Sequence, residues 1–159
     1  MGGNGARAAY DNYTLDVYSK DRFKQVGIIG NTKVVTSRTK NNNSTPMNSF
    51  GSSMYYITNP NDTTRITTIA FYNNRTHEIV KSIDLKYDKD GNLLPFQNYI
   101  HKGKVRNKGV HFHYWPEKYK GDAGRVQHDP NNFFEPTKTE WRYIKKALKY
   151  NEKHKNDKP

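Results

Sequence analysis

The sequence predicts an α+β domain, in which an antiparallel sheet of about 5 or 6 strands packs against one amphipathic helix near the C-terminus. Three β-rich runs follow one another in the middle of the chain, with turn residues between them. Apolar residues recur at helical spacing close to the C-terminus. The 159 residues suit a single domain, and 12 Tyr, 7 Phe and 2 Trp compensate for a hydrophobic fraction of only 33%.

Composition divides the chain into three parts. Residues 1–20 contain Gly, Ala and Asn without periodicity, and we expect a flexible N-terminal segment there. Residues 21–152 hold every predicted strand and the helix, and they form the single α+β domain. Residues 153–159 are polar and charged, and we expect a flexible tail.

The predicted strands begin with a hairpin, in which Gly30 and Asn31 form the turn between VGIIG and KVVTSR. The runs at 53–59, 65–72 and 78–87 then form an antiparallel meander, because the residues between them are turn formers such as Pro, Asn and Asp. Alternation along the third run gives it a core face with three apolar residues, Ile79, Ile83 and Leu85.

One further strand is predicted between the meander and the helix. Residues 93–109 are basic and predicted to be irregular. The run VHFHYW at 110–115 is predicted to be a strand, which Pro116 ends. Residues 117–136 are predicted to form a long loop.

The helix is predicted to begin at a capping box, because Thr137 and Glu140 have the required spacing. Its apolar stripe consists of three residues at helical spacing, Trp141, Ile144 and Leu148. We expect this stripe to be buried against the core face of the third run.

Charge and residue usage restrict the function classes. A net charge of +12 indicates a polyanionic partner, RNA or DNA before all others, and the alternative is that the charge serves solubility alone. The absence of cysteine excludes disulfides, thiolate catalysis and cysteine-based zinc sites. No run of about 18 apolar residues is present, so no membrane partner is expected.

The strand at 110–115 carries a pair of histidines. His111 and His113 point to one face, and Val110, Phe112 and Tyr114 point to the other. Because the apolar side chains are expected to face the core, we expect both imidazoles on an accessible face, where they can exchange protons near neutral pH. The alternative is that they are polar residues on a solvated sheet face.

A metal-independent ribonuclease needs a general base, a general acid and cations for the phosphate. The candidate catalytic residues are His111, His113 and His101. The candidate nucleic-acid-binding residues are Lys102, Lys104, Arg106, Arg125, Tyr114 and Trp115. The cations suit phosphates and the aromatic rings suit unpaired bases. The alternative for the basic segment is a solvated loop.

A metal site is a further reading of the histidine pair, since two histidines and a carboxylate can hold zinc, manganese or iron. Candidates for the third ligand are His101, Asp84, His128 and Asp129. No ligand spacing supports this reading, so the sequence predicts no metal and no other cofactor. Asp84 is equally suited to orienting a histidine or to capping a turn.

The stretches TIAFYNNRTHEIVKSIDLKY (68–87) and GVHFHYW (109–115), followed by a T-x-x-E helix, resemble a group of small proteins from phages and prophages of Gram-positive bacteria. These proteins are encoded beside head genes and carry a strand ending in "QIDLDH". The Gly-rich start MGGNGARA resembles the openings of head-associated proteins. This chain departs from the pattern at Lys86 and Tyr87. The layout also resembles barnase, colicin and RelE-type nucleases at the level of fold.

The resemblance implies a phage-encoded protein of the host cytoplasm or the virion. The basic charge and the candidate site residues indicate that it acts on nucleic acid. The enzyme reading is a metal-independent ribonuclease that uses the histidine pair. Two rivals are not enzymes: a head accessory protein that binds the genome or a head protein, and an inhibitor directed at a host protein. The enzyme needs its histidines and a cation to converge, whereas the binding proteins need only a continuous basic surface.

Overall fold

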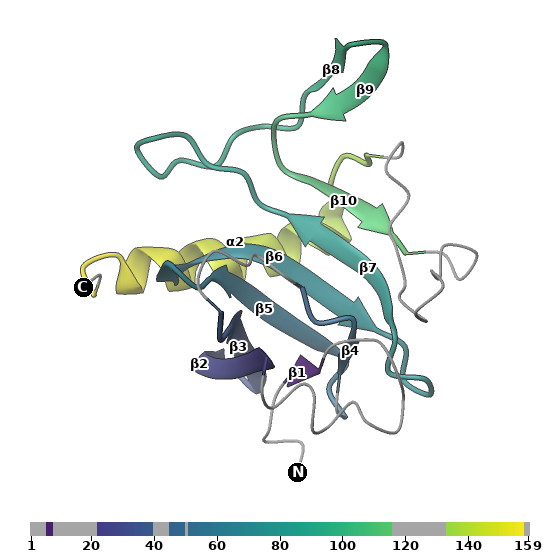
Figure 1. Ribbon diagram of the computed structural model, residues 1–159. Coiled ribbons are helices and arrows are strands. Elements are labelled where there is room, and N and C mark those ends of the chain that lie inside the picture. Colours follow the sequence, from purple (N-terminus) through teal and green to yellow (C-terminus); the bar gives the residue numbers. More distant parts are fainter. Residues whose placement is uncertain (1–5, 8–21, 40–44, 50, 116–132, 158–159) are drawn as a thin grey trace.

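The computed structural model describes residues 6–7, 22–39, 45–49, 51–115 and 133–157. Within them, a six-stranded sheet has the order β10-β7-β6-β5-β3-β2, and helix α2 (Lys138–His154) lies across it (Figure 1). The strands of this sheet are β2 (Phe23–Ile29), β3 (Thr32–Ser37), β5 (Met54–Asn59), β6 (Asp62–Tyr72), β7 (Ile79–Asp84) and β10 (His111–Tyr114). Two small sheets pair β1 (Ala6–Arg7) with β4 (Asn48–Ser49), and β8 (Asn98–His101) with β9 (Lys104–Asn107).

The α+β prediction is confirmed. The hairpin at Gly30 and Asn31 joins β2 to β3, and β5, β6 and β7 form the expected antiparallel meander. The sheet is mostly antiparallel, with one parallel pair between β3 and β5. Sequence alternation cannot specify that pairing, because a strand shows the same alternation beside a parallel or an antiparallel neighbour.

Both faces of the sheet are covered by apolar side chains. The cluster on the helix face consists of Val34, Tyr56, Ile66, Ile69, Ile83, Leu85, Val110, Phe112, Ile144, Ala147 and Tyr150. The cluster on the opposite face consists of Phe23, Val35, Tyr55, Ile57, Ala70, Tyr72 and Ile79. The histidine-bearing face of β10 is therefore not an open sheet surface, because it continues the second of these layers.

The expected core face of the third run is wrong at Ile79. The register of β6 and β7 shifts between Phe71, opposite Lys81, and Tyr72, opposite Ile79, so Val80 is an extra residue in β7. Such a bulge reverses the alternation. Ile79 consequently packs in the cluster opposite the helix, while Ile83 keeps the expected helix face.

The capping box of α2 is confirmed, with the Thr137 backbone N–H donating to Glu140 Oε1 at 2.7 Å. The buried line of the helix differs from the expected stripe and consists of Glu140, Ile144, Ala147 and Tyr150. Trp141 and Leu148 pack against the helix-face cluster from its sides and are only partly buried. Lys81 on β7 forms an ion pair with Glu140, which fixes the start of the helix over the sheet.

The prediction that residues 93–109 are irregular is wrong for β8 and β9, which form a hairpin that projects from the rest of the molecule (Figure 1). Its two turn residues have positive φ, 52° at Lys102 and 76° at Gly103, as the tightest hairpin turns require. Lysine is an unusual residue at the first of these positions, so the usual Asn-Gly or Asp-Gly signal was missing. We call residues 98–107 the arm.

Most of the predicted N-terminal segment and most of the predicted long loop lie outside the described residues, whereas residues 153–157 of the predicted tail are described. Residues 1–5 and 8–20 of the N-terminal segment lie outside, as do residues 117–132 of the long loop. Helix α2 continues to His154, two residues beyond the predicted end of the domain. No helix in the described part of the chain has the length and apolar character needed to cross a membrane.

Candidate metal centre

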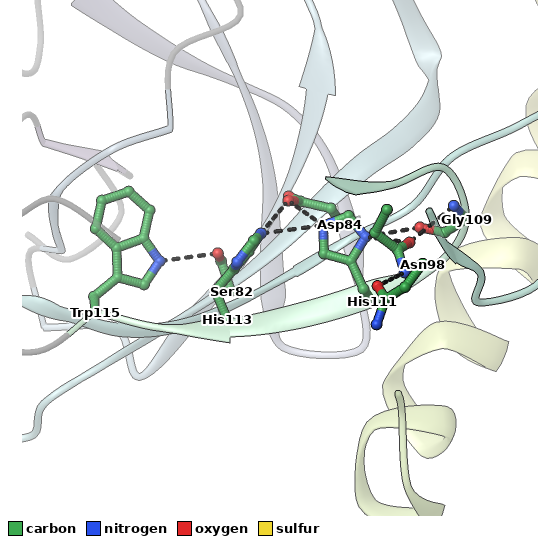
Figure 2. Close-up of polar contacts among 8 residues, drawn as sticks. Ser82, Asp84, Asn98, Gly109, His111, His113 and Trp115 are labelled. Atoms are coloured by element: carbon green, nitrogen blue, oxygen red, sulfur yellow. Dashed lines mark hydrogen bonds and ion pairs between the residues drawn. The ribbon is translucent and has the colours of Figure 1, made fainter. Parts of the chain in front are cut away.

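Strand pairing brings Asp84 to the histidine pair. β10 runs antiparallel to β7, with His111 directly opposite Asp84 and His113 directly opposite Ser82. Residues directly opposite each other share a face of the sheet. Asp84, His111 and His113 therefore converge on one point between the two strands, as Figure 2 shows. We call these three residues the triad.

The expectation that the histidines lie on an accessible face is wrong. They do share a face, but His111 is only 2% exposed and His113 only 3%. The expectation considered a helix as the only available cover. The ring of Phe133 instead packs on both imidazoles, with centroid distances of 5.0 Å to His111 and 5.2 Å to His113.

Three potential ligand atoms form a nearly equilateral triangle. Asp84 Oδ2 lies 3.1 Å from His111 Nε2 and 3.0 Å from His113 Nε2. The two Nε2 atoms lie 3.1 Å from each other. Separations of about 3 Å are those expected between atoms that bind one metal ion at about 2.0–2.1 Å, so Asp84, His111 and His113 could hold such an ion together. Three protein ligands would leave room for water or substrate on the ion.

The proton on His111 is fixed by its second nitrogen. His111 Nδ1 lies 2.7 Å from the carbonyl oxygen of Gly109 and 3.0 Å from Asn107 Oδ1. The oxygen of the Asn107 amide is identified by its partners, because it accepts from the Gly109 N–H while Nδ2 donates to Asn98. Since both neighbours of Nδ1 accept, Nδ1 carries a proton. A neutral His111 then presents the lone pair of Nε2 to the triad.

That lone pair creates a conflict that a cation would resolve. Asp84 Oδ2 only accepts when ionised, and neutral His111 has no proton on Nε2. At most one proton, from His113, would be available for three contacts of 3.0–3.1 Å. Either His111 is an imidazolium or a positive ion lies among the three atoms. A backbone carbonyl at Nδ1 is the usual outer partner of a metal-bound histidine.

Only glycine fits at the position that supplies this carbonyl. A Cβ on Gly109 would lie 1.6 Å from the carbonyl oxygen of Pro95. The next residue, Val110, donates its backbone N–H to the carbonyl of Leu94 at 2.9 Å. The segment before β10 is therefore held tightly against residues 94–95, and this contact positions the Gly109 carbonyl for His111.

Asp84 is the accessible member of the triad, since its side chain is 29% exposed. Burial raises the pKa of Asp84, but in the alternative without a bound cation, in which the imidazoles are protonated, the hydrogen bonds and positive charge of His111 and His113 outweigh it and hold that pKa well below its usual range. Asp84 also lines a cavity of about 630 Å³ whose walls include the cations Arg65 and Lys86. The cavity is also lined by Asp62, so an anionic ligand there would lie among the cations Arg65 and Lys86 and the carboxylates Asp62 and Asp84.

The structure does not bring the other candidate catalytic residue to the triad. His101 lies on the arm and is exposed, as are Lys102, Lys104 and Arg106. Arg125, with the two metal candidates His128 and Asp129, lies outside the described residues.

The two aromatic candidates differ in accessibility. Tyr114 is 52% exposed and packs edge-on against Phe134. Trp115 is partly buried, and its Nε1–H donates to Ser82 at 2.9 Å (Figure 2). Tyr114 therefore remains accessible to a base, whereas Trp115 belongs mainly to the protein interior.

Sequence reasoning missed three residues around the triad, namely Asn107, Gly109 and Phe133. The signal for the triad itself was present, because S-x-D and H-x-H alternate in the same way on two predicted strands. What the sequence lacked was the register that sets one motif opposite the other.

Comparisons with family models, with curated proteins and with solved structures found no match to this chain. The likeness to phage proteins and to nucleases stays a prediction.

Proposed function

We propose that the protein is a metal-dependent phosphodiesterase acting on nucleic acid, with one divalent transition-metal ion held by Asp84, His111 and His113. The observation that carries this proposal is the orientation of His111. Its Nδ1 donates to the Gly109 carbonyl, so a neutral His111 directs the lone pair of Nε2 at Asp84 and His113. The arrangement suits a cation better than it suits three mutual hydrogen bonds.

The ligand set indicates the kind of ion. Two imidazole nitrogens and one carboxylate oxygen suit Zn²⁺, Mn²⁺, Fe²⁺ or Co²⁺, whereas Ca²⁺ and Mg²⁺ prefer oxygen ligands alone. Three protein ligands on one side of the ion leave positions for water and substrate, which is the pattern of catalytic rather than structural metal sites. This proposal replaces the sequence-based expectation that no metal is bound.

Charge supports a phosphate-bearing substrate. The net charge of +12 favours a polyanion. Arg65 and Lys86 line the cavity that Asp84 opens onto, so a phosphodiester there could reach the ion while its remaining oxygens face these cations. The nearby ring of Tyr87, 5.0 Å from the Arg65 guanidinium carbon, helps to orient that cation.

The reaction is a hydrolysis. An ion held by Asp84, His111 and His113 would supply a bound water that is acidic enough to act as a nucleophile near neutral pH. In the overall hydrolysis, a bond forms from the water oxygen to phosphorus and the bond from phosphorus to one sugar oxygen breaks. That oxygen takes a proton from water, so one phosphodiester and one water yield a phosphomonoester and an alcohol. The mechanism needs no 2′-hydroxyl and therefore applies to both DNA and RNA.

Metal binding is tested first. Chelator-treated protein titrated with Co²⁺ should develop the visible absorption of a protein-bound ion, and Zn²⁺ should displace it. The variants His111→Gln and His113→Gln should lose this absorption. The control is His101→Gln, because His101 is exposed on β8 and is not one of the three residues whose ligand atoms meet at the triad. Equal Co²⁺ binding by all three variants would contradict the metal centre.

Cleavage is tested separately, with single-stranded RNA, single-stranded DNA and duplex DNA, in Mn²⁺, in Zn²⁺ and in chelator. Cleavage that requires added metal and the triad would support the proposal. A metal-loaded protein without cleavage would reject hydrolysis and favour a head accessory protein or an inhibitor. Cleavage in chelator that is confined to RNA would favour the metal-independent ribonuclease, in which the buried His111–His113 contact exchanges protons.

A further inference from the structure

The arm is the most exposed structured element in the described part of the chain. β8 is exposed at all four of its residues and β9 at the first three of its four. Figure 1 shows the arm extending away from the six-stranded sheet. Ile100 is 68% exposed and Val105 is 41% exposed. A projecting hairpin that keeps β-branched residues in water is suited to contacting a partner.

Strand register gives the arm two different faces. Tyr99 lies opposite Arg106 and His101 lies opposite Lys104, so one face is aromatic and basic. Ile100 lies opposite Val105 on the other face, which is apolar. The turn adds Lys102 at the tip. One face of the arm can therefore reach anions while the other contacts apolar groups.

Charge selects the kind of partner. Residues 91–116 contain no Asp or Glu, whereas residues 101–108 contain Lys102, Lys104, Arg106 and Lys108 as well as His101. No acidic side chain within the arm offsets these cations. A polyanion with a regular backbone of phosphates complements such a surface.

From these observations we infer that the arm binds duplex DNA by entering the major groove. This rests on the proposed function only in taking nucleic acid as the ligand. A two-stranded ribbon fits the major groove of B-form DNA, which is about 12 Å wide and about 8.5 Å deep. Four residues per strand make the arm about 13 Å long, close to the width of that groove, so Lys102 at the tip can reach a rim while the apolar face lies over the bases. The deep, narrow major groove of A-form RNA excludes such a ribbon.

The two faces have separate roles in this arrangement. Ile100 and Val105 contact base edges, including thymine methyl groups, and leave water on binding. Lys102, Lys104 and Arg106 extend to the phosphates along the rims. At the base of the arm, Asn107 Nδ2 donates to Asn98 Oδ1 at 2.8 Å, while Asn107 Oδ1 contacts His111. The same residue thus ties the arm to the triad.

The test is a fluorescence anisotropy titration of a labelled 20-base-pair DNA duplex, in chelator, at 50 mM and at 200 mM salt. The arm variant carries Lys102→Gln, Lys104→Gln and Arg106→Gln. The control variant carries the same number of charge removals on the exposed face of α2, Lys145→Gln, Lys146→Gln and Lys149→Gln. A third variant, Ile100→Ser with Val105→Ser, tests the apolar face. Thermal melts check that all three remain folded.

We expect the arm variant to bind the duplex about 100-fold more weakly at 50 mM salt, with a shallower salt dependence by about 3 in log–log slope. The helix control should change by less than about threefold. The apolar variant should weaken binding about tenfold with an unchanged slope, because it loses no phosphate contact. Single-stranded DNA and an RNA duplex of the same sequence should bind more weakly than the DNA duplex.

Equal losses in the two charge variants would overturn the inference, since binding would then depend on total charge alone. Tighter binding to a single strand or to the RNA duplex would also overturn it. Because the titration uses chelator and needs no turnover, its result is independent of the cleavage assay. If the arm binds DNA but the protein does not cleave it, only the proposed hydrolysis is rejected. If the protein cleaves nucleic acid but the arm does not bind DNA, only the proposed role of the arm is rejected.

Discussion

The side-chain oxygen of Asn107 lies 3.0 Å from Nδ1 of His111, four residues further along the chain. Asn107 is the last residue of β9, and His111 is the first residue of β10. The segment between them includes Gly109, whose carbonyl is the second acceptor at Nδ1. A short stretch of chain thus both ends the arm and sets the tautomer of a triad histidine.

Replacing Asn107 should weaken metal binding without removing a ligand. We expect Asn107→Ala to lower the affinity for Zn²⁺ about tenfold, because one of two acceptors at Nδ1 is lost and the Gly109 carbonyl remains. Competition with a chromophoric chelator measures this affinity. The control is Asn98→Ala, which removes only the partner of the Asn107 amide and should have a smaller effect. Unchanged affinity in Asn107→Ala would show that the second acceptor is not needed.

The contacts around Gly109 should make that residue irreplaceable. In Gly109→Ala the new Cβ would meet the Pro95 carbonyl oxygen, so the backbone must move. We expect a loss of about 3 kcal/mol in the free energy of unfolding, together with weaker metal binding. Gly103→Ala is the comparison variant, since nothing lies within 4 Å of its Cβ, although its φ of 76° disfavours any residue other than glycine. Its cost should be about 1 kcal/mol, and similar urea midpoints for the two variants would contradict this reasoning.

The ion pair between Lys81 and Glu140 should make stability depend on pH. Burial raises the pKa of Glu140, but Lys81 and Thr137 lower it by more, from 4.5 to about 2. A carboxylate with a depressed pKa stabilises the folded state above its unfolded value and loses this contribution as pH falls. The contribution is about 3 kcal/mol at pH 7.

Urea unfolding of the wild type and of Glu140→Gln measures that contribution. The difference between them should be largest near pH 7 and should shrink by about 2 kcal/mol at pH 3. Lys81→Met should reproduce the loss at pH 7, because either change breaks the same pair. A difference that stays constant with pH would show that Glu140 contributes through packing and capping instead.

Among the apolar residues of α2, Ile144 should contribute most to the free energy of unfolding. Ile144 has no exposed surface, whereas Leu148 is partly buried at the edge of the same cluster. We expect Ile144→Ala to cost about 3–4 kcal/mol and Leu148→Ala about half as much, since a less enclosed site leaves a smaller cavity. The loss in the free energy of unfolding for Trp141→Ala should be smaller than that for a fully buried aromatic residue, because Trp141 is only partly buried. Equal costs at 144 and 148 in urea unfolding would contradict the observed burial.

Local signals in the sequence determined the larger elements. The β-rich runs and the turn residues between them specified the meander, and the Thr137–Glu140 spacing specified the start of the helix. These elements follow from periodicity, turn chemistry and capping, which act over a few residues. The hairpin of the arm was not predicted, because a lysine occupies its first positive-φ turn position and its strands are short and exposed.

Only the tertiary structure decided the triad. Whether Asp84 lies opposite His111 depends on the register of two strands that are 27 residues apart in the chain, and alternation within either strand is compatible with other registers. The bulge at Val80 likewise moved Ile79 across the sheet without any glycine or proline to signal it. The aromatic ring that packs on both histidines belongs to Phe133, a residue 20 positions beyond His113. Each of these outcomes depends on packing between distant segments, which local sequence patterns do not encode.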